Sequence, residues 1–282
     1  MKKLFIILIL LFTYTNVLSA YNKSLTYPVE KTEKQNIALN LNYLKNFYFD
    51  TKKILLSPLS WDMYDWFTAS SIISSAILLS TEDKTIKNIV QSNRDKFVDS
   101  LATFAKPFGD GHYTIPPIAV FYIAGELFGN YKLKRTALLS FESFIISGIF
   151  TMAIKYTVNR ERPSQSYEAN VFHKPGNPVF SPAFPSGHSE AVFSIATILA
   201  TEFSDTIFIP VIAYTIATMT ALSRVNDNNH WTSDIIIGSA IGFFTAKSIE
   251  SYHPYRHYQP KLSISPMISN NKTFLTINYS FK

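Results

Sequence analysis

Cysteine is absent from the 282 residues, and its absence excludes disulfide bridges, thiolate zinc sites and a cysteine nucleophile. Charged residues are scarce at 16% of the chain, whereas 47% of the residues are hydrophobic and 15% are aromatic. Soluble domains usually carry more charge, so this composition favours buried helices, a membrane setting, or both. The formal net charge of +6 is mild. It fits an anionic ligand or a membrane surface and gives no evidence for nucleic acid as a partner.

The N-terminus has the pattern of an export signal. Lys2 and Lys3 precede an apolar run over residues 4–12, and Leu18-Ser19-Ala20 is a small-residue cleavage site. The apolar run is shorter than the roughly 20 residues that span a bilayer. This favours a cleaved signal peptide over residues 1–20, with an uncleaved membrane anchor as the alternative. Either way, we expect the chain to be exported to the periplasm or to an envelope membrane.

The remaining pattern divides the chain into an N-terminal extension, a helical domain and a tail. Residues 21–60 begin polar and then show helical spacing, which predicts one short amphipathic helix. Apolar segments recur between residues 61 and 250 and predict an all-α bundle. Its six helices are expected at about 62–80, 116–129, 133–158, 187–203, 206–222 and 232–249.

Three other segments have a different character. Residues 81–100 are rich in lysine and arginine and predict a charged, solvated helix or loop. Residues 164–184 form a long connector rich in Pro, Ser, Asn and Gly, which we interpret as a rim or lid. In residues 251–282 apolar and polar side chains alternate on either side of a turn signal, which predicts a β-hairpin tail.

Two cations bracket the end of the third predicted helix. Lys155 and Arg162 are seven residues apart, close to two helical turns, so both can lie on one face and reach one anion. Pro163 ends the helix at this point. The two side chains also fit a simpler interpretation, in which surface cations complement the dipole at a helix C-terminus.

The sequence Pro185-Ser186-Gly187-His188 precedes an apolar run and predicts a turn that enters the fourth helix, with Ser186 as its cap. Unpaired N–H groups at the start of a helix bind anions, and Gly187 allows the ligand to approach the backbone. His188 then lies at the edge of the anion, where it can donate a proton. An ordinary helix cap with an exposed histidine explains these residues equally well.

A histidine and a carboxylate mark the start of the sixth helix. His230 and Asp234 are four residues apart and therefore share a face, and Arg224 ends the fifth helix just before them. A carboxylate in this position can accept the ring N–H, fix the tautomer and raise the basicity of the imidazole. The free ring nitrogen can then attack phosphorus. A structural contact without a chemical role is the alternative.

Taken together, the motifs read K-x6-R-P, P-S-G-H and S-R-x5-H-x3-D. In this order and at these spacings the chain resembles the type 2 phosphatidic acid phosphatase (PAP2) superfamily, which also holds bacterial acid phosphatases and vanadium haloperoxidases. The resemblance covers roughly residues 61–250 and shows no departure at any motif position. Gly109-Asp110-Gly111 is also similar to family members, though less specifically.

The resemblance implies a metal-independent phosphatase that works through a phosphohistidine. His230 would be the nucleophile, Asp234 would orient it, and His188 would protonate the leaving group. The phosphoryl oxygens would be held by Lys155, Arg162, Ser186, Gly187 and Arg224. No metal or cofactor is expected, because three cations can stabilise the charge of the reacting phosphoryl group.

The apolar, aromatic-rich composition favours a lipid phosphate as substrate, met at a membrane surface or in the bilayer, with the site facing the periplasm. A broad-specificity soluble acid phosphatase, a vanadate-dependent haloperoxidase with His230 as its vanadate ligand, and a non-enzymatic envelope protein remain as alternatives. Topology adds a constraint. If the signal is cleaved and all six helices span, the site faces the cytosol. Membrane members of the family are expected to work on the outer face, so either one of these two assumptions fails or the domain is peripheral.

Overall fold

The computed structural model describes residues 37–174 and 181–254, together with the backbone of residues 262–269 and 272–279. The predicted signal peptide and the start of the N-terminal extension lie outside the described residues. Residues 175–180, in the middle of the predicted connector, do so as well.

The described part of the chain is helical apart from one hairpin and one isolated bridge. Its α-helices are α2 (Leu41–Leu56), α3 (Met63–Ser80), α4 (Asp83–Ser92), α5 (Lys96–Ala105), α6 (Gly111–Leu127), α7 (Tyr131–Val158), α8 (Gly187–Glu202), α9 (Phe208–Asn226) and α10 (Thr232–Tyr252). Short 3-10 helices follow α2 and α5 as η1 (Ser57–Ser60) and η2 (Lys106–Gly109). The predicted all-α class is therefore confirmed.

The predicted number of six helices is wrong. The six predicted segments are present as α3 and α6 to α10, and the short amphipathic helix predicted before them is present as α2, but the described residues also contain α4 and α5. The segment expected to be a solvated helix or loop is in fact two helices that cap the end of α9. Gln91 of α4 donates to the carbonyls of Val225 and Asn226, and the Asn226 amide donates to Asp99 of α5. Polar side chains there fasten one helix to another.

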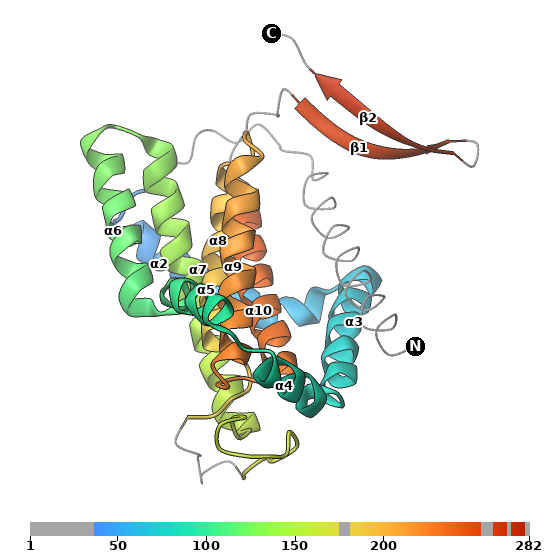
Figure 1. Ribbon diagram of the computed structural model, residues 1–282. Helices are drawn as coiled ribbons and strands as arrows, with labels where there is room; N and C mark the ends of the chain where they lie inside the picture. The colour runs from blue at the N-terminus through green and yellow to red at the C-terminus, as the bar shows by residue number, and fades with distance from the viewer. Residues whose placement is uncertain (1–36, 175–180, 255–261, 270–271, 280–282) are drawn as a thin grey trace.

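The centre of the bundle is α8, which packs against α7, α9 and α10. Figure 1 shows these four helices side by side, with α6 on the outer side of α7 and α3 at the opposite edge beside α10. The buried core between them contains Leu139 and Ile146 of α7, Ile198 of α8 and Ile249 of α10. Such a core fixes the ends of the four helices relative to one another.

Two glycines allow α10 to approach α8 closely. A Cβ atom at Gly238 would lie 2.3 Å from the carbonyl oxygen of Ser186, and one at Gly242 would lie 2.2 Å from that of Glu190. Any larger residue would force the two helices apart. The first turn of α8 is therefore held directly against the second and third turns of α10.

The connector after α7 is ordered where it is described. Asn159 adopts a left-handed conformation with φ 48°, which ends α7 and turns the chain back. Glu161 N then donates to Val171 O at 3.0 Å, and His173 N donates to Asn159 O at 3.0 Å. The first part of the connector is therefore paired with the residues that follow α7, and its role as a rim or lid stays a prediction.

The alternating tail forms two antiparallel strands, β1 (Leu262–Ser269) and β2 (Lys272–Tyr279). Leu262 pairs with Tyr279 at one end and Ser269 with Lys272 at the other. Figure 1 shows this hairpin to one side of the helical bundle.

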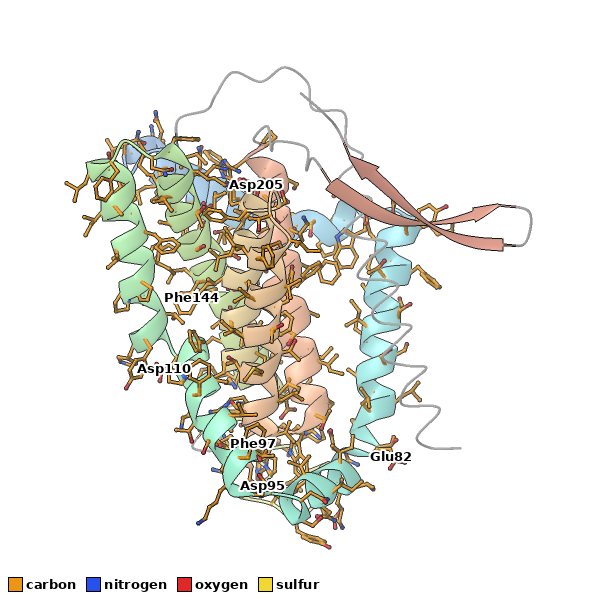
Figure 2. All side chains as sticks on the ribbon, turned by 45° about the horizontal axis from the view of Figure 1, so that its top comes forward. Glu82, Asp95, Phe97, Asp110, Phe144 and Asp205 are labelled. Atoms are coloured by element: carbon orange, nitrogen blue, oxygen red, sulfur yellow. The ribbon has the colours of Figure 1, made fainter. Side chains whose placement is uncertain are left out.

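Two of the described helices, α7 and α9, are long and apolar enough to cross a membrane, judged by length and composition alone. Core helices of soluble proteins share these properties, and half of the apolar window of α7 is buried within the bundle. In Figure 2 the side chains of α3 and α6 project outward from the two edges of the bundle. Many of these projecting side chains are large and apolar.

Candidate active site

The predicted site residues gather at one end of the bundle, the lower end in Figure 1. This end brings together the C-terminal ends of α7 and α9 with the N-terminal ends of α8 and α10. The residues placed here are Lys155, Arg162, Ser186, Gly187, His188, Arg224, His230 and Asp234.

His230 and Asp234 face each other as their spacing predicts. His230 Nδ1 lies 3.6 Å from Asp234 Oδ2, and both side chains are buried. This separation is longer than a hydrogen bond, and Nδ1 has no other partner among the described residues. Asp234 Oδ2 meanwhile accepts a 2.8 Å hydrogen bond from Trp231 N. The pair is thus oriented for contact, and catalytic hydrogen bonds often close only when a substrate is present.

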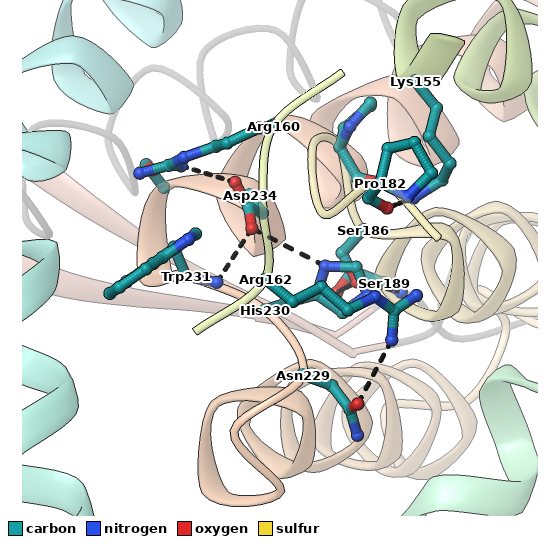
Figure 3. Close-up of polar contacts among 12 residues, drawn as sticks. Lys155, Arg160, Arg162, Pro182, Ser186, Ser189, Asn229, His230, Trp231 and Asp234 are labelled. Atoms are coloured by element: carbon teal, nitrogen blue, oxygen red, sulfur yellow. Dashed lines mark hydrogen bonds and ion pairs between the residues drawn. The ribbon is translucent and has the colours of Figure 1, made fainter. Parts of the chain in front are cut away.

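Arg160 contacts the predicted site, and the sequence analysis did not include it. Figure 3 shows Asp234 between Arg160 and His230. Arg160 donates to Asp234 Oδ1 at 2.6 Å, and its other terminal nitrogen donates to Asp83 Oδ2 of α4 at 2.8 Å. Asp83 also accepts from the backbone N–H of Ser233 at 3.0 Å. A buried cation from the loop after α7 therefore joins the carboxylate behind His230 on α10 to Asp83 on α4.

The signal that could have revealed Arg160 is a third cation inside the K-x6-R-P spacer, where a neutral residue would be enough for a helix end. Its partner Asp83 is 77 residues away along the chain. Local periodicity gives no information on such a distant pair.

Ser186 caps α8 as predicted. Its Oγ accepts from Ser189 N at 3.4 Å and from Ser189 Oγ at 2.9 Å. Its own N–H donates to the carbonyl of Asp234 at 3.0 Å. A Cβ atom at Gly187 would meet nothing within 4 Å among the described residues. The helix start next to the His–Asp pair therefore has free space above it, where an anion fits the positive end of the helix dipole.

Lys155 points at this helix start from α7. Its ammonium donates to the carbonyls of Pro182 and Pro185, each at 2.8 Å. Both carbonyls belong to the segment that leads into Ser186. The ammonium group therefore contacts Pro185, the residue just before the predicted anion site.

Arg162 reaches the site by a route that the sequence analysis did not predict. Since α7 ends at Val158, Arg162 does not share a helix face with Lys155, and that part of the prediction is wrong. The turn at Asn159 instead carries Arg162 back across the bundle end. Its guanidinium donates to Ser181 O at 2.8 Å, Ser181 Oγ at 2.7 Å and Asn229 Oδ1 at 3.1 Å.

Arg224 is buried at the end of α9 and donates to Ser223 Oγ and to Asp227. Its carbonyl accepts from His230 N at 3.2 Å, which ties the loop before α10 to this helix end. Burial and the neighbouring charge of Arg224 lower the pKa of Arg162. Like charges that are held together away from water repel each other strongly, and a bound anion relieves this repulsion.

His188 lies in the first turn of α8, and its buried Nε2 has no hydrogen-bond partner within the described part of the chain. The backbone of Gly109 packs against it, because a Cβ atom there would lie 2.8 Å from the His188 Cβ atom. This contact explains why a glycine stands at position 109. Burial, followed by the charge of Arg224 and by His230, lowers the pKa of His188 to about 3.

Burial also lowers the pKa of His230 to about 4, with help from Lys155 and Arg162 and against the opposing effect of Asp234. At neutral pH the imidazole is therefore uncharged and able to act as a nucleophile.

Comparison with known proteins places this site in a family. Residues 136–258 match the family model of the PAP2 superfamily. The resemblance predicted from the motifs is therefore confirmed for this segment of the chain. The match takes in most of α7, all of α8 to α10 and every predicted site residue, whereas Asp83 lies outside it.

Two solved structures are similar to this chain. A transmembrane PAP2-type phosphatidylglycerolphosphate phosphatase from Bacillus subtilis is 20% identical, with a TM-score of 0.52, over 65% of this chain and 94% of that chain. LpxE from Aquifex aeolicus is 20% identical, with a TM-score of 0.48, over 60% of this chain and 94% of that one.

Among curated proteins, a lipid A 1-phosphatase of Porphyromonas gingivalis is 36% identical over 66 residues. This stretch is 23% of the present chain and 15% of the length of that relative.

Proposed function

We propose that the PAP2 domain is a phosphatase that hydrolyses the phosphomonoester or pyrophosphate of a lipid through a phosphohistidine intermediate. The observation that carries the proposal is the meeting of a His–Asp pair, an open helix start and three basic side chains at one end of the bundle. Phosphoryl transfer requires positioning and charge stabilisation more than covalent machinery. This arrangement supplies both.

In the proposed reaction Nε2 of His230 attacks phosphorus while Nδ1 faces Asp234. The bond from phosphorus to the leaving oxygen breaks, and His188 gives that oxygen a proton. The dianionic phosphate is what allows His188 to hold this proton, since its pKa is low without an anion nearby. His188 then takes a proton from water, which attacks the phosphohistidine and releases inorganic phosphate.

The cations change partners during this cycle. Lys155 and Arg162 are bonded to neutral oxygens of the chain itself, and a phosphoryl oxygen is a stronger acceptor than these. Arg224 approaches the same phosphoryl group from the end of α9. The N–H groups at Gly187 and His188 complete the cradle.

A lipid substrate is supported by apolar side chains on the outside of the domain. Those exposed on α3, α6 and α9 include Trp66, Phe67, Ile73, Ile77, Val120, Phe121, Ile123, Val211 and Ile212. Large exposed apolar patches on a protein surface mark contact with lipid or with another protein. The name of the curated relative, a lipid A 1-phosphatase, also supports a lipid phosphate. We place the domain at an envelope membrane with its active site facing the periplasm, in accord with the N-terminal export pattern.

A substrate panel tests the proposal. We expect at least one lipid phosphate to exceed 4-nitrophenyl phosphate by about tenfold or more in kcat/KM, because its acyl chains add binding energy that the aryl ester lacks. The panel comprises phosphatidic acid, phosphatidylglycerol phosphate, undecaprenyl pyrophosphate and lipid A phosphate in matched detergent micelles. The measurement is release of inorganic phosphate. Equal values would favour a broad-specificity acid phosphatase, and halide oxidation that appears only with vanadate would favour a haloperoxidase.

The pH dependence offers a second test. The acid limb of log kcat/KM is expected near pH 4, because the rate rises with pH as His230 loses its proton and becomes nucleophilic. In Asp234→Asn the limb should move to lower pH, since the carboxylate raises that pKa, and the maximal rate should fall. Circular dichroism at each pH controls for unfolding. The substrate phosphate itself titrates at about pH 6, so its ionisation is measured separately and divided out of the profile. A remaining acid limb that Asp234→Asn leaves in place contradicts the assignment.

A further inference from the structure

A second cluster of ionisable side chains lies far from the active site. Asp50 of α2, Glu142 in the first half of α7 and His253 just after α10 meet at the other end of the bundle, the end that Asp205 marks in Figure 2. All three are buried, with exposures of 3%, 0% and 5%. Each offers one ligand atom, and these atoms lie within 4.8 Å of one another.

The cluster lacks a partner for one of its carboxylates. His253 Nε2 lies 2.7 Å from Asp50 Oδ2, so these two side chains satisfy each other in part. Both carboxylate oxygens of Glu142 have no hydrogen-bond partner in the described part of the chain. A fully buried, unpaired carboxylate is among the least favourable groups in a protein interior. A proton shared with Asp50, or a cation bound between the two groups, would remove this cost.

Nearby protein cations do not supply that partner. Arg135 is already committed to Glu202 at 2.6 Å, to Glu250 at 3.4 Å and to the carbonyl of His253 at 2.6 Å. Lys53 lies 3.6 Å from Asp50 Oδ1, but its side chain is 58% exposed. Among the described residues, two buried carboxylates and one imidazole are thus left with a single solvated ammonium group.

We propose that Asp50, Glu142 and His253 bind a divalent first-row transition-metal ion such as Zn²⁺ or Mn²⁺. One imidazole nitrogen with two carboxylate oxygens is a donor set that suits these ions, and two carboxylates balance the charge of the ion. Metal–ligand bonds of about 2.0–2.2 Å place neighbouring ligand atoms roughly 3–3.5 Å apart. The cluster reaches this geometry by opening the contact between His253 and Asp50 slightly and drawing Glu142 inward.

The bound ion ties three segments that are distant in sequence. It fastens α2, which precedes the bundle, to α7 and to the last turn of α10. Because the active site lies at the opposite ends of α7 and α10, the ion stabilises the fold and takes no part in phosphoryl transfer. A chelator should therefore lower the melting temperature and leave the initial rate of phosphate release at 25 °C unchanged.

The test uses the full chain without a histidine tag, stripped with EDTA and then given ZnCl2 or MnCl2 alone. After desalting, mass spectrometry of the metal content should find one equivalent of metal per chain. The melting temperature should rise on the order of 5 °C. Glu142→Gln should lose both effects. Glu126→Gln, an exposed carboxylate on α6, and His230→Ala, at the active site, should keep both.

X-ray absorption of the zinc-loaded wild-type chain decides the matter if Glu142→Gln does not fold. One imidazole with oxygen donors supports the site, and a spectrum dominated by several imidazoles overturns it. Absence of stoichiometric metal, with no change in melting temperature, also overturns the proposal and leaves Glu142 and Asp50 as a pair that shares one proton. The proposal is also overturned if Glu142→Gln and Asp50→Asn bind metal as well as the wild type does.

Discussion

Replacement of His230 by alanine is expected to abolish phosphate release, with a loss on the order of 10⁴-fold or more. Without the imidazole no covalent intermediate forms, and water must attack phosphorus unaided. The fold should survive, because Asp234 keeps its hydrogen bonds from Arg160 and from Trp231 N. The measurement is phosphate release from the best lipid substrate, together with the melting temperature and circular dichroism of the variant.

A second histidine provides the control. His173 contacts Glu161 at 2.6 Å within the connector and is a third exposed, so His173→Ala should retain most of the activity. Rapid quenching with labelled substrate should trap an acid-labile phosphoprotein in the wild type but not in His230→Ala. If purified His230→Ala turned substrate over at the wild-type rate, His230 would be excluded as the nucleophile.

Arg160→Gln should destabilise the chain by about 3–5 kcal/mol, because it leaves Asp83 and Asp234 buried without their cation. The activity should fall as well, since Asp234 loses the donor that fixes it behind His230. Arg162→Gln, two residues away, should behave differently. Its partners Ser181 and Asn229 are neutral, so stability should change little, while kcat/KM should fall about 10²- to 10³-fold.

Urea unfolding and phosphate release, measured on both variants, separate these roles. A double variant adds a sharper criterion: Asp83→Asn in the Arg160→Gln background should restore part of the lost stability, because one of the two stranded charges is removed. Arg160→Gln with wild-type stability and activity would show that the guanidinium holds nothing in place.

Local pattern was enough to locate much of this structure. Proline and the change from apolar to polar residues placed the ends of α3 and α7 to α10 within a few residues. Because the motif residues sit at these ends, one prediction about helix boundaries also placed His188 and His230 at the same end of the bundle. The cap at Ser186 followed from its position before an apolar run.

What local pattern could not reveal is pairing across the fold. Nothing in the neighbourhood of Asp83 distinguishes a buried partner of Arg160 from an ordinary residue in the first turn of an exposed helix. From the sequence Gln91 is likewise expected to be solvated, but in the fold it donates to a carbonyl at the end of α9. The turn at Asn159, which redirects Arg162, depends on one left-handed residue that helical periodicity does not detect.

The contact between Gly238 and Ser186 has a consequence for biosynthesis. The ribosome completes α8 before α9 and α10, so a nascent chain contains His188 and the cap residue before it contains His230. The Ser186 N–H finds its acceptor, the carbonyl of Asp234, only when α10 has docked through Gly238. The proposed activity therefore begins only when the last helix of the bundle docks, and incomplete chains are inactive.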